Sequence, residues 1–193
     1  MGICMHALTS TFVDNTSGRK TLVWLFLSIL FIASFAVYFV PVITAETGGL
    51  RPIDTQVPLT AEVIYRDLVN YSPKALSVYG WFLLVDCFYP ATLATFIAYF
   101  WGLMLQYAHK PQLTSIARKG LILLPFAGAL LDVCENIGLA VIISNYPEEL
   151  WDVAYVVQGF RTAKLTVQIG DILITLGMMG LVSILWLKEL RSR

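Results

Sequence analysis

Five charged side chains lie inside or at the edge of long apolar runs of this sequence. They are Asp86, Asp132, Glu135, Lys164 and Asp171. An ionised group in the hydrocarbon core of a bilayer is costly, so such residues are rare and usually face a partner or a water-filled cavity. Carboxylates and an amine in that setting are suited to proton transfer or to cation binding. We therefore treat these five as the candidate functional residues.

Their spacing groups them on helix faces. Asp132, Glu135 and Asn136 are three and four residues apart, which places them on one face of a helix. A later apolar run carries a matching polar stripe at helical spacing, made of Arg161, Lys164, Gln168, Asp171 and Thr175. We expect these two stripes to line one pocket, with Arg161 and Gln168 at its rim.

A third run contributes Tyr79, Asp86, Tyr89 and Pro90, which share a helix face. Pro90 has no N–H to donate to the carbonyl of Asp86, four residues earlier. A free carbonyl beside a carboxylate can hold a cation or a water. We expect Tyr79 and Tyr89 to support Asp86 from the rim.

Depth in the membrane can be counted from the inner interface at about 1.5 Å per residue. The count places Asp132 about 18 Å, Asp171 about 24 Å and Lys164 about 34 Å from that interface. It predicts a polar pocket that opens outward and is closed below by apolar packing. Four carboxylates then face one cation, Lys164, so either some acids hold protons or a cationic ligand occupies the pocket.

These residues predict an integral membrane protein whose outward-facing pocket binds a small, cationic or lipid-like ligand, with or without coupling to proton movement. Asp132 and Glu135 would titrate, Lys164 would be the counter-charge, and Asp86 and Asp171 would gate or contact the ligand. One alternative is an intramembrane enzyme that uses acid–base chemistry on a lipid, a sterol or an isoprenoid. Another is an accessory subunit of a larger membrane complex. Buried polar pairs can also serve only to fix the register of a helix bundle.

The composition indicates what must position these side chains. The chain has 193 residues, of which 58% are hydrophobic and 13% are charged, whereas soluble domains have about 25% charged residues. Four apolar stretches are long enough to cross a bilayer as helices: about 21–41, 78–107, 117–144 and 160–187. Because backbone amides in lipid must be satisfied within each segment, we expect a single all-α membrane domain over 1–193, built as a four-helix bundle.

The distribution of lysine and arginine predicts the orientation of the bundle. One set of span ends carries most of the cations: Arg19, Lys20, Lys110, Arg118, Lys119, Lys188, Arg191 and Arg193. The positive-inside rule then places both termini and the 108–118 loop in the cytoplasm, and the 42–77 segment outside.

Three shorter segments carry further expectations. The 42–77 segment is predicted to contain an amphipathic helix that begins after Thr60, a good N-cap residue. This helix either lies on the outer membrane surface or caps the bundle, and its mixed charges favour the cap. Residues 1–18 are predicted to form a mobile polar tail. Pro147 is followed by Glu148 and Glu149, a pattern typical of a helix start, so we expect a short surface helix ahead of the fourth span.

Several classes of function are excluded. The apolar runs hold no paired histidines for haem, and the chain lacks the His and Cys ligand sets of zinc sites. No glycine-rich phosphate loop is present, and no basic surface favours nucleic acid. We therefore expect no cofactor, no metal and no nucleic-acid partner. The expected partners are membrane lipids, the ligand, and either a second copy of the chain or a larger membrane complex.

Three features of the sequence can be considered together: Asp132-x-x-Glu135-Asn136, Asp86…Tyr89-Pro90, and Lys164 near the start of the fourth span. In these features the chain resembles uncharacterised bacterial four-span integral membrane proteins over most of its length after residue 50. The resemblance implies a location in the bacterial inner membrane, and it carries no activity with it.

Overall fold

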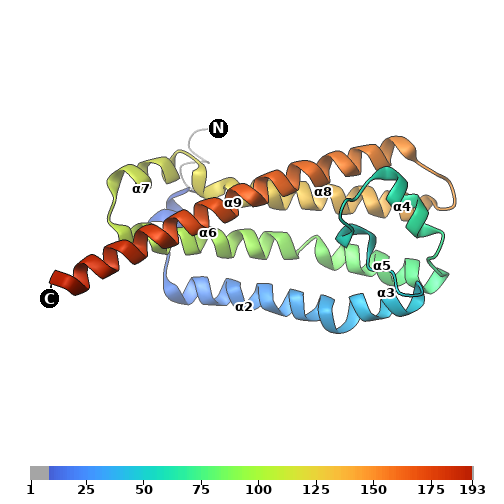
Figure 1. Cartoon of the computed structure of the whole chain (residues 1–193), viewed down its shortest axis with the longest axis horizontal. Coiled ribbons are helices and arrows are strands. Elements are labelled where there is room, and N and C mark those ends of the chain that lie inside the picture. Colours follow the sequence, from blue (N-terminus) through green and yellow to red (C-terminus); the bar gives the residue numbers. More distant parts are fainter. Residues whose placement is uncertain (1–8, 193) are drawn as a thin grey trace.

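A computed structural model of the chain describes residues 9–192, and over that range the secondary structure is helical, without strands. Four helical stretches are long and apolar enough to cross a membrane: Gly18–Glu46, Pro73–Ala108, Leu121–Asn145 and Trp151–Ser192. The prediction of four spans is thereby confirmed. The first, second and fourth observed stretches are longer than predicted, whereas the third is shorter because it begins at Leu121 and not near residue 117. The spans run side by side along the long axis of the molecule (Figure 1).

The first span is one continuous helical rod made of three parts. It comprises α2 (Gly18–Ser34), a π-helical turn (Phe35–Phe39) and α3 (Val40–Glu46). It packs mainly on the second span, and its other face exposes large apolar side chains such as Leu22, Phe26 and Val37. This face is suited to contact lipid.

The second span is broken where its carboxylate lies. Helix α5 (Pro73–Asp86) ends at Asp86, and α6 (Tyr89–Ala108) begins three residues later with Pro90 in its first turn. Proline is accommodated there because the first turn needs no N–H donor from it. Tyr79 and Asp86 therefore belong to α5, and Tyr89 and Pro90 belong to α6, whereas the sequence predicted all four on one face of a single helix.

The third and fourth spans form the most extensive helix pair. Helix α8 (Leu124–Asn145) follows a short 3₁₀ turn (Leu121–Leu123), and α9 (Trp151–Ser192) packs along it. Gly138 lets the two helices approach, since a Cβ there would collide with the buried side chain of Val157. The helix predicted after Pro147 is absent from this described segment, because residues 146–150 form a tight connection and α9 begins directly at Trp151.

The segment between the first and second spans folds over one end of the bundle. It holds a 3₁₀ turn (Ile53–Thr55) and α4 (Ala61–Leu68). The Oγ1 of Thr60 accepts a hydrogen bond from the backbone N–H of Val63 at 3.3 Å, which confirms the predicted N-cap. Ile64 and Leu68 are fully buried against the bundle, with α4 next to α9.

The N-terminal segment packs at the opposite end, close to α7 (Pro111–Arg118). Residues 9–13 are helical, and Phe12 and Val13 are buried against α6 and α8. A Cβ at Gly102 of α6 would collide with the carbonyl oxygen of Phe12, so glycine is required for this contact. The prediction of a mobile polar tail is wrong for residues 9–18, and residues 1–8 lie outside the described part of the chain.

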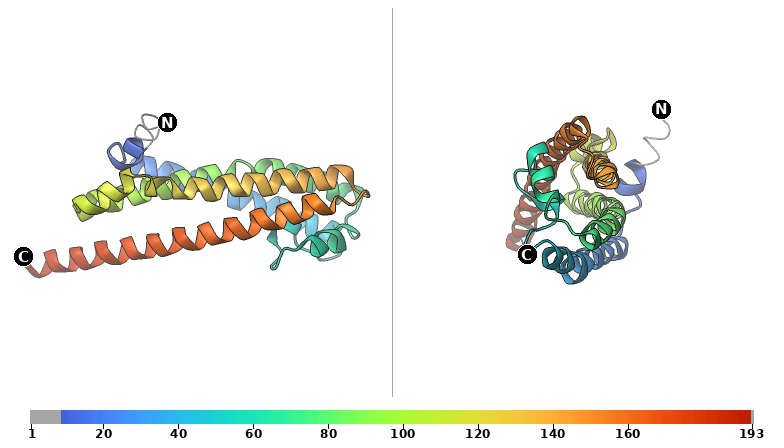
Figure 2. Two further views of the ribbon diagram at one scale, coloured as in Figure 1. Left: turned by 90° about the horizontal axis from the view of Figure 1, so that it is seen from above. Right: turned by 90° about the vertical axis from the view of Figure 1, so that its right-hand side faces the viewer.

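Helix α9 extends beyond its neighbours. Its 42 residues correspond to about 63 Å at 1.5 Å per residue. Figure 1 and the left view of Figure 2 show its C-terminal end reaching past the ends of the other spans.

Candidate functional site

Lys164 of α9 forms the centre of a buried charge cluster with two carboxylates of α8. Its Nζ lies 2.8 Å from Oδ1 of Asp132 and also pairs with the carboxylate of Glu135. Arg161, one turn earlier on α9, places Nη1 3.5 Å from Oε1 of Glu135. Glu135 is fully buried and Lys164 is only 5% exposed. Residues of the two polar stripes are therefore in contact, and Arg161, which was predicted at the rim, is a direct partner of Glu135.

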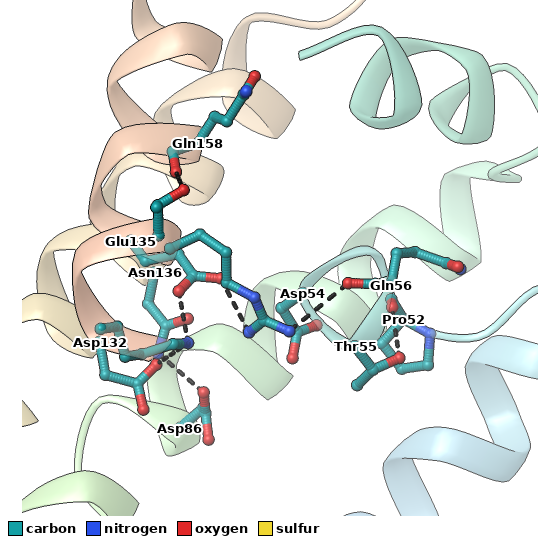
Figure 3. Close-up of polar contacts among 12 residues, drawn as sticks. Pro52, Asp54, Thr55, Gln56, Asp86, Asp132, Glu135, Asn136 and Gln158 are labelled. Carbon is teal, nitrogen blue, oxygen red and sulfur yellow. Dashed lines mark hydrogen bonds and ion pairs between the residues drawn. The ribbon is translucent and has the colours of Figure 1, made fainter. Parts of the chain in front are cut away.

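The second span joins the cluster through an amide. Nδ2 of Asn136 donates to Oδ2 of Asp86 at 2.9 Å, and both side chains are buried (Figure 3). Asp86 is the last residue of α5, so the break before Pro90 places its carboxylate at the junction of three helices. Sequence reasoning had assigned Asp86 to this site.

Sequence reasoning missed Asp54, which lies in the 3₁₀ turn of the segment that covers the bundle. The hydroxyl of Tyr79 donates to Oδ1 of Asp54 at 3.1 Å and accepts from the backbone N–H of Asp54 at 3.1 Å. Burial, with a smaller contribution from the charge of Asp86, raises the pKa of Asp54 to about 7. The only signal in the sequence was the apolar Ile53 beside it in a stretch otherwise rich in turn residues.

The same segment closes the cluster at this end of the bundle. Nη2 of Arg161 donates to the backbone carbonyl of Gln56 at 3.5 Å, and Oε1 of Gln158 accepts from the N–H of Ala61 at 3.2 Å. The prediction that the charged pocket opens toward the 42–77 segment is wrong. The reason is that residues 51–68 fold back over the cluster and form hydrogen bonds with Gln158 and Arg161 of α9.

A cavity instead adjoins the cluster on its other side, between α6, α8 and α9. Its volume is about 450 Å³, and most of its lining is apolar. Its lining includes Tyr89, Phe96, Asp132, Gln168, Asp171 and Thr175. Ile172 and Leu176 also line it and are 57% and 60% exposed on the outside of α9, so the cavity borders the lipid-facing surface. The sequence predicted apolar packing directly below the charged residues, whereas the structure has a cavity there.

Two carboxylates line this cavity, and Asp171 is the one without an ion pair among the described residues, since Asp132 pairs with Lys164. Asp171 is 6% exposed, and its Oδ1 is buried without a hydrogen-bond partner among residues 9–192. Gly128 of α8 faces it, since a Cβ there would lie 3.9 Å from Oδ2 of Asp171. The neighbouring hydroxyl of Thr175 donates to the backbone carbonyl of Asp171 at 2.7 Å and accepts from Nε1 of Trp101 at 2.8 Å. Neither of these bonds satisfies the carboxylate.

The depths counted from the sequence are wrong for Lys164. The counted difference between Lys164 and Asp132 is about 16 Å, yet the two side chains are in contact. The count assumed that every span ends at the same inner plane. Helix α9 instead continues past the other spans, so a given distance from its C-terminal end corresponds to a shallower position.

The cluster contains more acid than base. Within the described residues it contains the carboxylates Asp54, Asp86, Asp132 and Glu135 and the cations Arg161 and Lys164. Ion pairs with the two cations account for Asp132 and Glu135. Asp86 and Asp54 are held by the neutral groups of Asn136 and Tyr79. The arrangement can therefore hold at least one proton without losing an ion pair.

The fold and site define a four-span helical membrane protein with a buried charge cluster and an adjoining cavity. No family model matches this chain, and no curated protein or solved structure matches it either. The resemblance to bacterial four-span proteins stays a prediction.

Proposed function

We propose that this protein binds an organic cation with an apolar body in the cavity between α6, α8 and α9. The observation that carries the proposal is the carboxylate of Asp171, buried in the wall of an apolar cavity of about 450 Å³ with an unpaired oxygen. A buried ionised carboxylate is stabilised by a cationic partner. Every other acid in this region has a side-chain partner within the described part of the chain.

The lining supports an organic cation rather than a metal ion. Hard metal ions bind to sets of six or more oxygen ligands, whereas the apolar side chains of this cavity are typical of sites for small organic molecules. Aromatic rings of Tyr89 and Phe96 are available to an ammonium group or to an apolar body. The position beside Ile172 and Leu176 supports entry of the ligand from the bilayer.

The proposal includes an orientation. Helix α7 contains Arg118 and is flanked by Lys110 and Lys119, and it lies toward the same end as the C-terminus (Figure 1), so the positive-inside rule supports a cytoplasmic location for both termini. The covering segment with α4 would then be extracytoplasmic. By the resemblance stated above, the membrane would be the bacterial inner membrane.

A binding measurement with a fixed-charge probe tests the function. The protein in lipid nanodiscs is dialysed against tritiated benzyltriethylammonium, and the neutral N,N-diethylbenzamide is the comparison ligand. We expect the cation to bind at least tenfold more tightly than the neutral compound. Asp171→Asn should weaken cation binding at least 30-fold, because removal of one partner of a buried charge pair costs about 2–5 kcal/mol.

The matched control is Asp152→Asn, which removes an exposed acid from the first turn of the same helix. It should bind the cation as the unmodified protein does. Equal binding by Asp171→Asn and Asp152→Asn would contradict the proposal, as would a failure of the unmodified protein to prefer the cation. Native mass spectrometry of gently solubilised protein would then identify the ligand that copurifies.

A further inference from the structure

We propose that a cation entering the cavity expels a proton from the charge cluster through Asp54, at the end of the bundle covered by α4. The protein would thus exchange an organic cation for a proton. This inference rests on the proposed function, since it requires a cation in the cavity.

Asp132 connects the two parts of the site. Its side chain lines the cavity and pairs with Lys164 at 2.8 Å. Gly128, which faces Asp171, is one helical turn before Asp132, a rise of about 6 Å along α8, and both carboxylates line the same cavity. A cation held by Asp171 is therefore close enough to attract Asp132 and to compete with Lys164 for it.

Lys164 transmits this competition. It is shared between Asp132 and Glu135, so a ligand cation at Asp132 leaves the charge of Lys164 less compensated. The positive charge of Lys164 already acts to lower the pKa of Asp54. Weaker pairing with Asp132 strengthens that effect, because less negative charge screens the ammonium group.

Asp54 is the group best placed to release the proton. Its pKa of about 7 means that both protonation states are populated at neutral pH. It also lies outside the four spans, next to the exposed Thr55. The titratable and charged groups that act on it come from several elements: Tyr71 before α5, Tyr79 and Asp86 on α5, Glu135 on α8 and Lys164 on α9.

The charge of the buried region is conserved in this exchange. One positive charge enters at Asp171 and Asp132, and one proton leaves the carboxyl group of Asp54 for the solution beyond α4. No covalent bond other than the O–H of Asp54 is broken. A buried cluster that keeps its net charge avoids the desolvation cost of an added charge.

Isothermal titration calorimetry measures the exchange directly. Benzyltriethylammonium, which does not titrate, is added to the nanodisc-embedded protein in buffers of different ionisation enthalpy, and the buffer dependence gives the protons released per cation. We expect release of a fraction of one proton, largest near pH 7. The Kd should also weaken as the pH falls from 8 to 6, by up to about tenfold for each unit by which the cation lowers the pKa of Asp54.

Two variants locate the exit. Asp54→Asn should bind the cation without releasing a proton between pH 7 and 8, and with a Kd independent of pH over that interval. Tyr79→Phe removes a hydrogen bond that lowers the pKa of Asp54, so proton release should persist with its maximum shifted to higher pH. Asp152→Asn is again the matched control and should release protons as the unmodified protein does.

The outcomes separate the two proposals. Cation binding without proton release in the unmodified protein would overturn the exchange and leave the proposed function intact. Absence of cation binding would overturn both. Unchanged proton release in Asp54→Asn, or an unshifted maximum in Tyr79→Phe, would overturn the assignment of the exit to Asp54.

Discussion

Replacement of Lys164 by methionine should destabilise the protein more than replacement of either of its carboxylate partners. Lys164 is 5% exposed and pairs with Asp132 and Glu135, so its loss leaves Asp132 without a cation and Glu135 with only the 3.5 Å contact to Arg161. Removal of one member of a buried ion pair costs about 3–5 kcal/mol. We expect Lys164→Met to lower the free energy of unfolding by that amount.

The two single carboxylate variants have smaller expected costs. Glu135→Gln leaves Lys164 paired with Asp132, and Asp132→Asn leaves it paired with Glu135. Each loses one charge-assisted hydrogen bond, about 1.5–3 kcal/mol. In the double variant Lys164→Met/Glu135→Gln the remaining uncompensated charge is smaller, so its cost should be less than the sum of the two single costs.

The assay is unfolding by sodium dodecyl sulfate in mixed micelles, followed by tryptophan fluorescence and circular dichroism. Ser144→Ala, on the exposed surface of α8, is the control and should change the free energy of unfolding little. A free energy of unfolding for Lys164→Met equal to that of the unmodified protein would refute the reasoning. So would a cost for Glu135→Gln as large as that for Lys164→Met.

Three further predictions concern other parts of the fold. Gly102→Ala should displace the N-terminal segment from α6, which faster chymotrypsin cleavage after Phe12 would reveal; unchanged cleavage would contradict the packing of Phe12. Gly138→Ala should cost about 1–3 kcal/mol in the same unfolding assay, because the β-branched Val157 has little freedom to move away. The pKa of Asp54 is raised from 3.8 to about 7 on folding, so its contribution to stability is complete below pH 4 and is lost as the pH rises through 7. Asp54→Asn should therefore be more stable than the unmodified protein at pH 8 and similar to it at pH 4, and a stability difference independent of pH would contradict this.

The parts of the structure that depend on local patterns were predictable from the sequence. Hydrophobic runs identified all four spans, and the spacing of Asp132, Glu135 and Asn136 placed them on one face of α8. The N-cap at Thr60 followed from its side-chain chemistry. Each of these inferences uses residues within one helix, where 3.6-residue periodicity fixes the geometry.

The parts that depend on contacts between segments were not predictable. The position of Lys164 along the bundle axis can be predicted only if the end of α9 relative to the ends of the neighbouring helices is known. Asp54 reaches the cluster only because the 51–68 segment folds back on the bundle. Two apolar residues, Phe12 and Val13, are too few to predict that the N-terminal segment packs on α6. The contact is close, because a Cβ at Gly102 would collide with the carbonyl oxygen of Phe12. The cavity is a space between three helices, for which single residues give no signal.

The hydrogen bond between Trp101 and Thr175 has a practical consequence. Trp101 is 1% exposed, and its indole N–H is held by the hydroxyl of a residue that lines the cavity. The wavelength of maximum indole fluorescence depends on the polarity and hydrogen bonding around the ring. A ligand that moves the Thr175 side chain away from Trp101 therefore shifts the emission maximum of Trp101. With Trp24, Trp81, Trp151 and Trp186 replaced by phenylalanine, the remaining indole is a built-in optical sensor that reports occupancy in real time without a label.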